Sequence, residues 1–137
     1  RDRQAGTTTN MPLPPGANSC EDPRISDFGD IVAQCNMSSG SAQAFLYKPA
    51  GAGAFYQLST STTASAGNGT SGNYTGISAD GVFMVFDSAA SDLVPDDTNN
   101  TLDVFVALPE PDAARGWRVS ISALAVAARR RRKRRSR

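Results

Sequence analysis

A degenerate internal repeat runs through this chain of 137 residues and limits the folds that it can adopt. Residues 24–33 and 76–85 share an Ile-Ser pair, a glycine three positions later and a following apolar run, at an offset of 52. Residues 44–47 and 104–107 correspond at an offset of 60, so the second copy contains the longer loop. Repeats of this length are typical of propellers and solenoids, in which each copy forms one small structural unit.

Each copy is predicted to form a small antiparallel sheet, because aromatic residues make up only 7% of the chain and small polar residues dominate. Asp80-Gly81 predicts a two-residue type I′ hairpin, since that turn needs positive φ at both central positions. The polar stretch 59–73 is expected to be an exposed connection between the two units. The strands are expected at 23–26, 30–35, 43–47 and 54–59 in the first copy and at 74–78, 82–87 and 103–107 in the second.

Charge divides the chain into two unlike parts. Between residues 4 and 114 the sequence has two basic residues against twelve acidic ones, a net charge of −10. Eight of the fourteen basic residues lie in 129–137. The acidic body disfavours nucleic acid as a partner. The chain contains no histidine, so the commonest general base and the commonest metal ligand are both missing.

Residues 76–106 read GISADGVFMVFDSAASDLVPDDTNNTLDVFV, which resembles the repeat of TolB-type, WD-like β-propellers found in exported bacterial proteins. In that family the repeat runs approximately ISADGRYVAFxSxASNLVxGDTNGxxDVFV. Residues 1–9, RDRQAGTTT, are similar to the hairpin that follows the DVFV strand. Residues 20–58 resemble a divergent copy, in which Phe28 replaces the turn aspartate and the DTN loop is missing.

The resemblance implies an all-β protein whose four-stranded antiparallel blades pack around a central axis, with ligands bound at the mouth of the channel. We expect a partial propeller of about one and a half to two blades, taken from a longer protein. Residues 1–19 would end a preceding blade, 20–60 would form a divergent blade, and 61–107 would form a second blade. Residues 108–137 would then form a tail with a short apolar, Arg-rich end.

The tail permits three interpretations. Pro109-Glu110-Pro111, the apolar stretch 119–128 and the basic run 129–137 together resemble the PEP-CTERM class of bacterial sorting tails. That resemblance implies membrane association through 117–137, with the basic run on the cytoplasmic side, although ten apolar residues fall short of the ~20 that a span needs. Residues 117–122 also resemble the outer strand that closes a blade. A nucleic-acid-binding arm is the third interpretation, and it conflicts with the acidic body.

Two sets of residues are candidate sites. Asp97, Asn99 and Asp103 place carboxylate and amide oxygens at alternating positions, which suits a hard cation such as Ca²⁺. The alternative is a polar turn whose side chains cap their own backbone. Cys20 and Cys35 form a candidate disulfide: with a turn around Phe28-Gly29, Cys35 would lie opposite Asp22 and Cys20 one diagonal step away. Two free thiols are the alternative.

No catalytic residues are predicted. The pairs Asp96/Asp97 and Asp27/Asp30 could suggest acid–base chemistry, but that requires two carboxyls in distinct environments facing one cleft. The glycine-rich stretch 67–72 lacks the lysine of a phosphate-binding loop. We therefore expect a non-enzymatic, exported module, without a cofactor other than the candidate Ca²⁺, that binds a protein or cell-envelope ligand. The alternative is the propeller domain of a larger, peptidase-like hydrolase.

Overall fold

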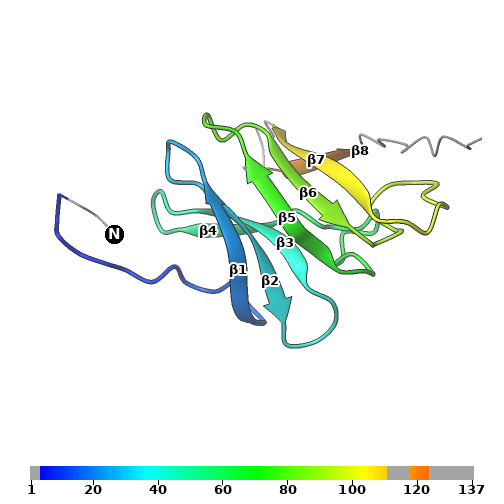
Figure 1. Ribbon diagram of the computed structural model, residues 1–137, viewed down its shortest axis with the longest axis horizontal. Helices are drawn as coiled ribbons and strands as arrows, with labels where there is room; N and C mark the ends of the chain where they lie inside the picture. Colours follow the sequence, from blue (N-terminus) through cyan, green and yellow to red (C-terminus); the bar gives the residue numbers. More distant parts are fainter. Residues whose placement is uncertain (1–3, 111–117, 124–137) are drawn as a thin grey trace, which may run out of the picture.

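The computed structural model describes residues 4–110 and 118–123, and these residues form an all-β fold of two four-stranded antiparallel sheets without a helix (Figure 1). The first sheet contains, in order, β1 (Ala17–Ile25), β2 (Ile31–Met37), β3 (Gln43–Lys48) and β4 (Ala54–Gln57). The second contains, in order, β5 (Ser71–Ile77), β6 (Met84–Ser88), β7 (Asp103–Glu110) and β8 (Arg118–Ala123). Each sheet is a simple meander, in which successive strands are neighbours.

The seven strands predicted from the sequence are all present, and their ends differ from the expected positions. β1 begins at Ala17, which is six residues earlier than expected. The second sheet also has a fourth strand, Arg118–Ala123, which pairs with β7 and lies beyond the predicted unit 61–107. Of the three interpretations of the tail, the closing strand is the one that agrees with the structure of residues 118–123.

The two sheets stack face to face, and the hydrophobic core lies between them (Figure 1). Because side chains alternate along a strand, each sheet has an inner face toward its partner and an outer face away from it. The inner face of the first sheet consists of Val32, Gln34, Ala44 and Leu46. The inner face of the second sheet consists of Met84, Phe86, Phe105 and Ala107. The rings of Phe86 and Phe105 stack with their centroids 5.6 Å apart in this core.

Strand pairing corrects the repeat alignment by one residue. Cys35 pairs with Gln43 in the first sheet, and Ser88 pairs with Asp103 in the second. The offset is therefore 53 from β2 to β6 and 60 from β3 to β7. The predicted offset of 52 was wrong for this strand, because the loop before β6 is one residue longer than the loop before β2. With the corrected offsets, the outer face of the second sheet corresponds to the inner face of the first.

The loop between β5 and β6 is not the predicted type I′ turn. Gly81 has a φ of 70°, but Asp80 is not among the residues with positive φ. The N–H of Ser78 donates to the carbonyl of Phe83 at 2.8 Å, so the loop is longer than two residues. The Asp80 carboxylate accepts hydrogen bonds from the Ser78 hydroxyl and from the Val82 N–H. Asp80 therefore organises the loop through its side chain rather than through a left-handed backbone.

The connection between the sheets is only partly exposed, contrary to the prediction. Residues 62–66 are exposed, but Ser59, Ser61 and Gly67 are buried. A Cβ atom at Gly69 would lie 2.6 Å from the backbone of Ala89, and one at Gly67 would lie 2.8 Å from a methyl group of Leu93. The small residues of this stretch therefore allow its backbone to pack closely against the loop after β6.

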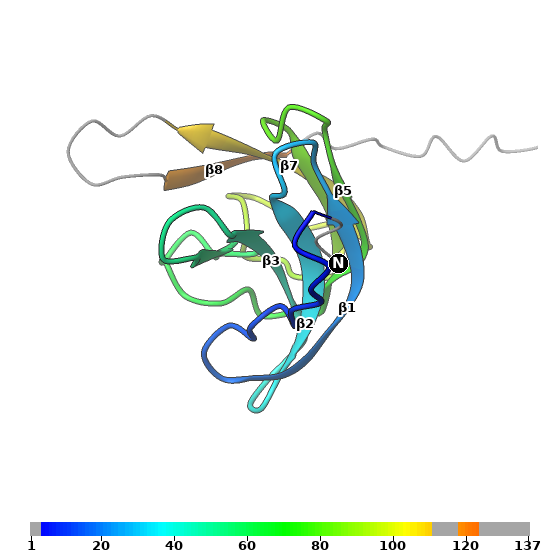
Figure 2. The same cartoon turned by 90° about the vertical axis from the view of Figure 1, so that its left-hand side faces the viewer.

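The arm that precedes β1, residues 4–16, is an extended segment on the side of the first sheet away from the second sheet (Figures 1 and 2). Met11 and Leu13 of the arm, with Cys20, Pro23 and Ile31, contribute to the lining of a hollow of about 440 Å³ over the outer face of the first sheet. Pro14 is fully buried. The arm therefore covers part of an apolar sheet face that would otherwise be exposed.

Candidate functional site

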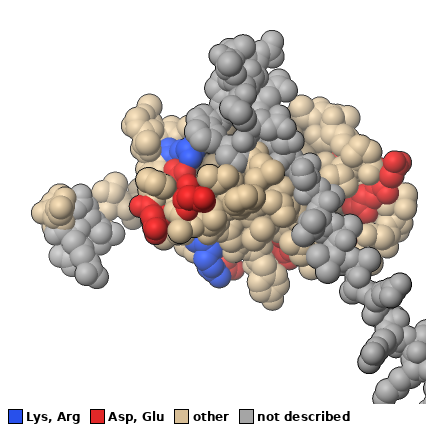
Figure 3. Space-filling view, turned by 90° about the horizontal axis from the view of Figure 1, so that it is seen from above, with Lys and Arg blue, Asp and Glu red and all other residues tan. Residues whose placement is uncertain are grey.

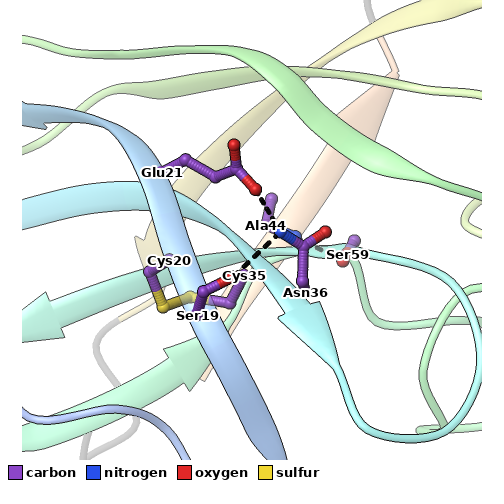
Figure 4. Close-up of a disulfide and its surroundings, with 7 residues drawn as sticks. All are labelled: Ser19, Cys20, Glu21, Cys35, Asn36, Ala44 and Ser59. Atoms are coloured by element: carbon purple, nitrogen blue, oxygen red, sulfur yellow. Dashed lines mark hydrogen bonds between the residues drawn. A yellow bond between two sulfur atoms is a disulfide. The ribbon is translucent and has the colours of Figure 1, made fainter.

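Cys20 and Cys35 form a disulfide that crosslinks β1 and β2 on the outer face of the first sheet (Figure 4). The two cysteines are directly opposite partners, so the expected diagonal arrangement was wrong. Two features shift the register: the turn is centred on Phe28, so that Ile25 pairs with Ile31, and a β-bulge between Glu21 and Arg24, where Asp22 has a φ of 50°, adds one more residue. The described residues contain no free cysteine.

A network of polar side chains beside the disulfide fastens the same pair of strands. The Asn36 amide on β2 donates to the Ser19 hydroxyl at 3.1 Å and to the Glu21 carboxylate, and both acceptors lie on β1 (Figure 4). In the second sheet, Ser71 and Ser88 occupy the positions equivalent to Cys20 and Cys35. These two serines are also direct partners, are fully buried, and have their hydroxyl oxygens 2.7 Å apart.

Asp97, Asn99 and Asp103 lie in or beside the loop between β6 and β7, around a hollow of about 250 Å³. The Asn99 side chain donates to the Asp103 carboxylate at 2.8 Å and accepts from the Thr101 N–H at 2.9 Å. Both polar atoms of Asn99 are therefore used within the loop, as in the polar-turn alternative. Within the described ranges, no cluster of three or more His, Cys, Asp or Glu residues could hold a metal ion.

Two buried glutamines that the sequence did not single out hold the first sheet to β5 and to the connection between the sheets. The Gln34 amide on β2 donates to the Ser71 carbonyl at 3.1 Å and to the Asn73 side chain at 3.0 Å. The Gln43 amide on β3 donates to the Gly67 carbonyl at 3.1 Å. Gln34 and Gln43 are 7% and 1% exposed, so these bonds satisfy groups that solvent cannot reach.

The outer face of the second sheet (Val85, Asp87, Val104 and Val106) is an apolar surface that the first sheet does not cover. Val85 and Val104 are 40% and 48% exposed, and Tyr74 beside them is 78% exposed. With Leu102 these side chains border a hollow of about 320 Å³. Asp87 lies in this hollow and is only 4% exposed, and its Oδ2 has no hydrogen-bond partner among the described atoms.

The carboxylates of one candidate pair, Asp27 and Asp30, lie in different environments, whereas those of the other pair, Asp96 and Asp97, line the same hollow. Asp30 is buried and forms an ion pair with Lys48, whereas Asp27 is exposed. Asp96 and Asp97 both line the hollow beside β7.

In the loop between β5 and β6, the hydrogen bond from the Ser78 hydroxyl, followed by that from the Val82 N–H, holds the pKa of Asp80 below its usual value. Among the described residues, acidic side chains cover more of the face seen in Figure 3 than basic ones do.

The tail lies mostly outside the described residues. Pro111, residues 112–117 and the basic run 129–137 are not described, and neither are the side chains of β8. In the part of the chain that the structure covers, no helix is long and apolar enough to cross a membrane.

Comparison with protein-family models, with curated proteins and with solved structures gives no match.

Proposed function

We propose that this protein is a non-enzymatic, exported module of propeller type, which presents a binding surface for a protein or cell-envelope ligand. The single observation that carries this proposal is the stacking of two equivalent four-stranded sheets. The inner face of the first sheet and the outer face of the second are equivalent surfaces, so the sheets pack head to tail. Head-to-tail packing can be continued by further units, as in a propeller.

The disulfide and the tail support the proposal of export. A crosslink between Cys20 and Cys35 persists in an oxidising compartment, such as the periplasm or the cell exterior. The order of Pro109-Glu110-Pro111, an apolar stretch and the basic run 129–137 is consistent with a sorting tail. If residues 117–137 act as a sorting tail, their deletion should release the protein from the surface of a bacterial host. If they serve only as a strand, the protein is not retained at the surface, and the deletion releases nothing.

The hollow beside the loop between β6 and β7 is small for a complete ligand, because pockets for small-molecule ligands usually have volumes of about 300 to 1,000 Å³. The hollow bordered by Val94, Asp97 and Phe105 has about 250 Å³, which suits one side chain of a partner. Asp97 adds a carboxylate that favours a basic or hydroxyl-bearing group.

Binding by the oxidised full-length chain tests this function. The probes are solubilised bacterial envelope proteins and purified peptidoglycan sacculi, with wild type compared with Asp97→Ser. Asp27→Ser is the matched control, because Asp27 is also a loop aspartate but lies at the β1–β2 turn. Saturable binding that Asp97→Ser weakens and Asp27→Ser leaves unchanged supports the proposal. Equal binding of all three proteins, or binding to neither probe, rejects it.

Thermal unfolding tests the propeller architecture separately. Two blades cannot close a propeller, so the chain alone should unfold over a broad temperature range or associate with other molecules. A monomer that unfolds in one sharp, cooperative transition would contradict the partial-propeller interpretation.

A further inference from the structure

The hollow of about 250 Å³ beside the loop between β6 and β7 combines an apolar lining with negative charge. Its apolar lining residues are Val94, Pro95, Val104 and Phe105. Its charged lining residues are Asp96, Asp97 and Asp103, and no lysine or arginine among the described residues lines it. The Asp103 carboxylate accepts a hydrogen bond from Asn99 at 2.8 Å, whereas the carboxylates of Asp96 and Asp97 have no hydrogen bond or ion pair within the described ranges. The hollow therefore suits a side chain with an apolar stem and a positive charge.

The end of β8 brings the rest of the chain to this hollow. In the register of β7 and β8, Ala123 lies opposite Phe105, which lines the hollow. Because β8 is antiparallel to β7, it runs back toward the start of β7 and ends on the side of the loop between β6 and β7 (Figure 1). Residues 124–137 therefore continue the chain from a point beside the hollow.

The sequence that follows β8 has the charge that the hollow lacks. Residues 124–128 are all leucine, alanine or valine, and the basic run 129–137 contains eight lysine and arginine residues. An extended chain spans at most ~3.5 Å per residue, so Arg129 lies within about 20 Å of Ala123. The body of the chain is acidic, with a net charge of −10 between residues 4 and 114. The basic run can therefore reach carboxylates of opposite charge on its own chain.

Covalent attachment compensates for the weakness of ion pairs at a protein surface. One exposed ion pair contributes little to binding, because solvent and salt screen it. A short flexible connection, however, holds the second group at an effective concentration in the millimolar range. An arginine side chain also packs its aliphatic stem on apolar residues while its guanidinium binds carboxylates. Val104 and the two carboxylates of Asp96 and Asp97 offer both kinds of contact in one hollow.

We propose that the basic run 129–137 occupies this hollow in the same molecule, with one arginine stem against Val104 and its guanidinium paired with Asp96 and Asp97. Within the described ranges, no group of three or more His, Cys, Asp or Glu residues could hold a metal ion, so the carboxylates suit an extended cation better than a metal. The basic run then competes with a partner for Asp97, and this regulatory consequence rests on the proposed function. A basic run that is bound to a membrane surface leaves the hollow open.

Crosslinking of the oxidised full-length chain with a water-soluble carbodiimide tests this inference, because the reagent joins an amine to a carboxylate only where the two are in contact. Lys133 is the only lysine of the basic run, and Lys48 is the only other lysine of the chain. Peptide mass spectrometry identifies the carboxylates that are joined to Lys133 at low salt and at about 1 M salt, where the screening length is ~3 Å. Lys133→Arg identifies the products that depend on this amine. The test variant is Asp97→Asn, and the matched control is Asp27→Asn, because Asp27 is an exposed aspartate at the turn between β1 and β2.

The expected product joins Lys133 to Asp96 or Asp97 within one molecule, so its yield does not depend on protein concentration and falls at about 1 M salt. Asp97→Asn should lower the yield at Asp96 about two- to fivefold, which is the effect of one exposed ion pair, and Asp27→Asn should leave that yield unchanged.

Three outcomes would each overturn the proposal: no product with Lys133, products spread evenly over the exposed carboxylates of both sheets, or a yield at Asp96 that Asp97→Asn does not change. The crosslinking contains no envelope probe, so its outcome does not depend on the proposed function. If the expected products form and neither envelope probe binds the chain, the proposed function fails and the occupied hollow stands.

Discussion

Replacing Cys20 and Cys35 by serines should lower the free energy of unfolding by about 3 kcal/mol. The disulfide joins residues 15 apart in sequence, and closing a loop of that length in the unfolded chain is worth about 3 kcal/mol at 25 °C. Serine is the appropriate replacement, because Ser71 and Ser88 occupy the equivalent positions in the second sheet and form a buried hydrogen bond. The folded state of the variant therefore keeps a contact between β1 and β2, and the loss is mainly that of the crosslink.

Urea denaturation followed by circular dichroism measures this loss. Three samples are compared: oxidised wild type, reduced wild type, and Cys20→Ser/Cys35→Ser under either condition. The reduced wild type and the variant should unfold alike, at a lower urea concentration than the oxidised wild type, by the equivalent of about 3 kcal/mol. If the free energies of unfolding of the oxidised wild type and the variant differ by less than about 1 kcal/mol, the reasoning is refuted. The crosslink would then not stabilise the protein by restricting the unfolded chain.

The converse substitution tests the same reasoning at the equivalent position. Ser71→Cys/Ser88→Cys places two cysteines directly opposite each other across β5 and β6, with a separation of 17 residues. If the two sheets are equivalent, oxidation should join this pair and raise the free energy of unfolding by about 3 kcal/mol. Mass spectrometry that finds two free thiols after oxidation would show that the correspondence does not extend to this geometry.

Three further outcomes can be measured on single variants. Gly69→Ala should cost about 3 kcal/mol of stability, whereas Gly67→Ala should cost about 1 kcal/mol, because the first Cβ meets backbone and the second meets a movable leucine side chain. Gln43→Ala should cost about 2 kcal/mol in urea denaturation, since it leaves buried groups of the inter-sheet connection unsatisfied. An NMR titration should place the pKa of Asp80 below the ordinary value of an aspartate, and Ser78→Ala should raise that pKa. Because the folded-state pKa is lowered, the stability that Asp80 contributes is present above the unfolded-state pKa and is lost as the pH falls through the folded-state value.

The strands could be predicted because their signal is local. Short runs of β-branched and aromatic residues separated by glycine, serine and aspartate define seven strands, and the apolar repeat relates one sheet to the other. The register could not be predicted, because it depends on a bulge at Asp22 and on a loop that is one residue longer before β6. Neither feature leaves a pattern in composition or periodicity.

The composition of 59–73 was misinterpreted for a physical reason. Small polar residues are common in exposed loops, and they also allow two backbones to approach closely. Gly67 and Gly69 have the second role, with Ser59 buried beside them. A stretch of Gly and Ser therefore does not distinguish exposure from close packing until its neighbours are known.

The Cys20–Cys35 disulfide could be proposed from the sequence. The direct pairing of the two cysteines could not, because it depends on the bulge between Glu21 and Arg24. The correspondence between Asp87 and Gln34 required the structure, because only the corrected offset aligns these two residues. At these equivalent positions one copy has a buried amide and the other has a buried carboxylate.

The cysteine pair and the serine pair occupy equivalent positions of the two sheets, but the sheet faces on which they lie are covered differently. Both pairs lie between the first two strands of a sheet, at equivalent positions. Ser71 and Ser88 are fully buried on the inner face of the second sheet, where the first sheet packs over them. The corresponding face of the first sheet is covered by the extended arm, with a hollow beneath it, so packing contributes less there. A disulfide stabilises mainly by constraining the unfolded chain and does not require a neighbouring sheet. The crosslink therefore lies on the sheet face that the arm covers in part, and the uncovered apolar face lies on the opposite side of the two stacked sheets.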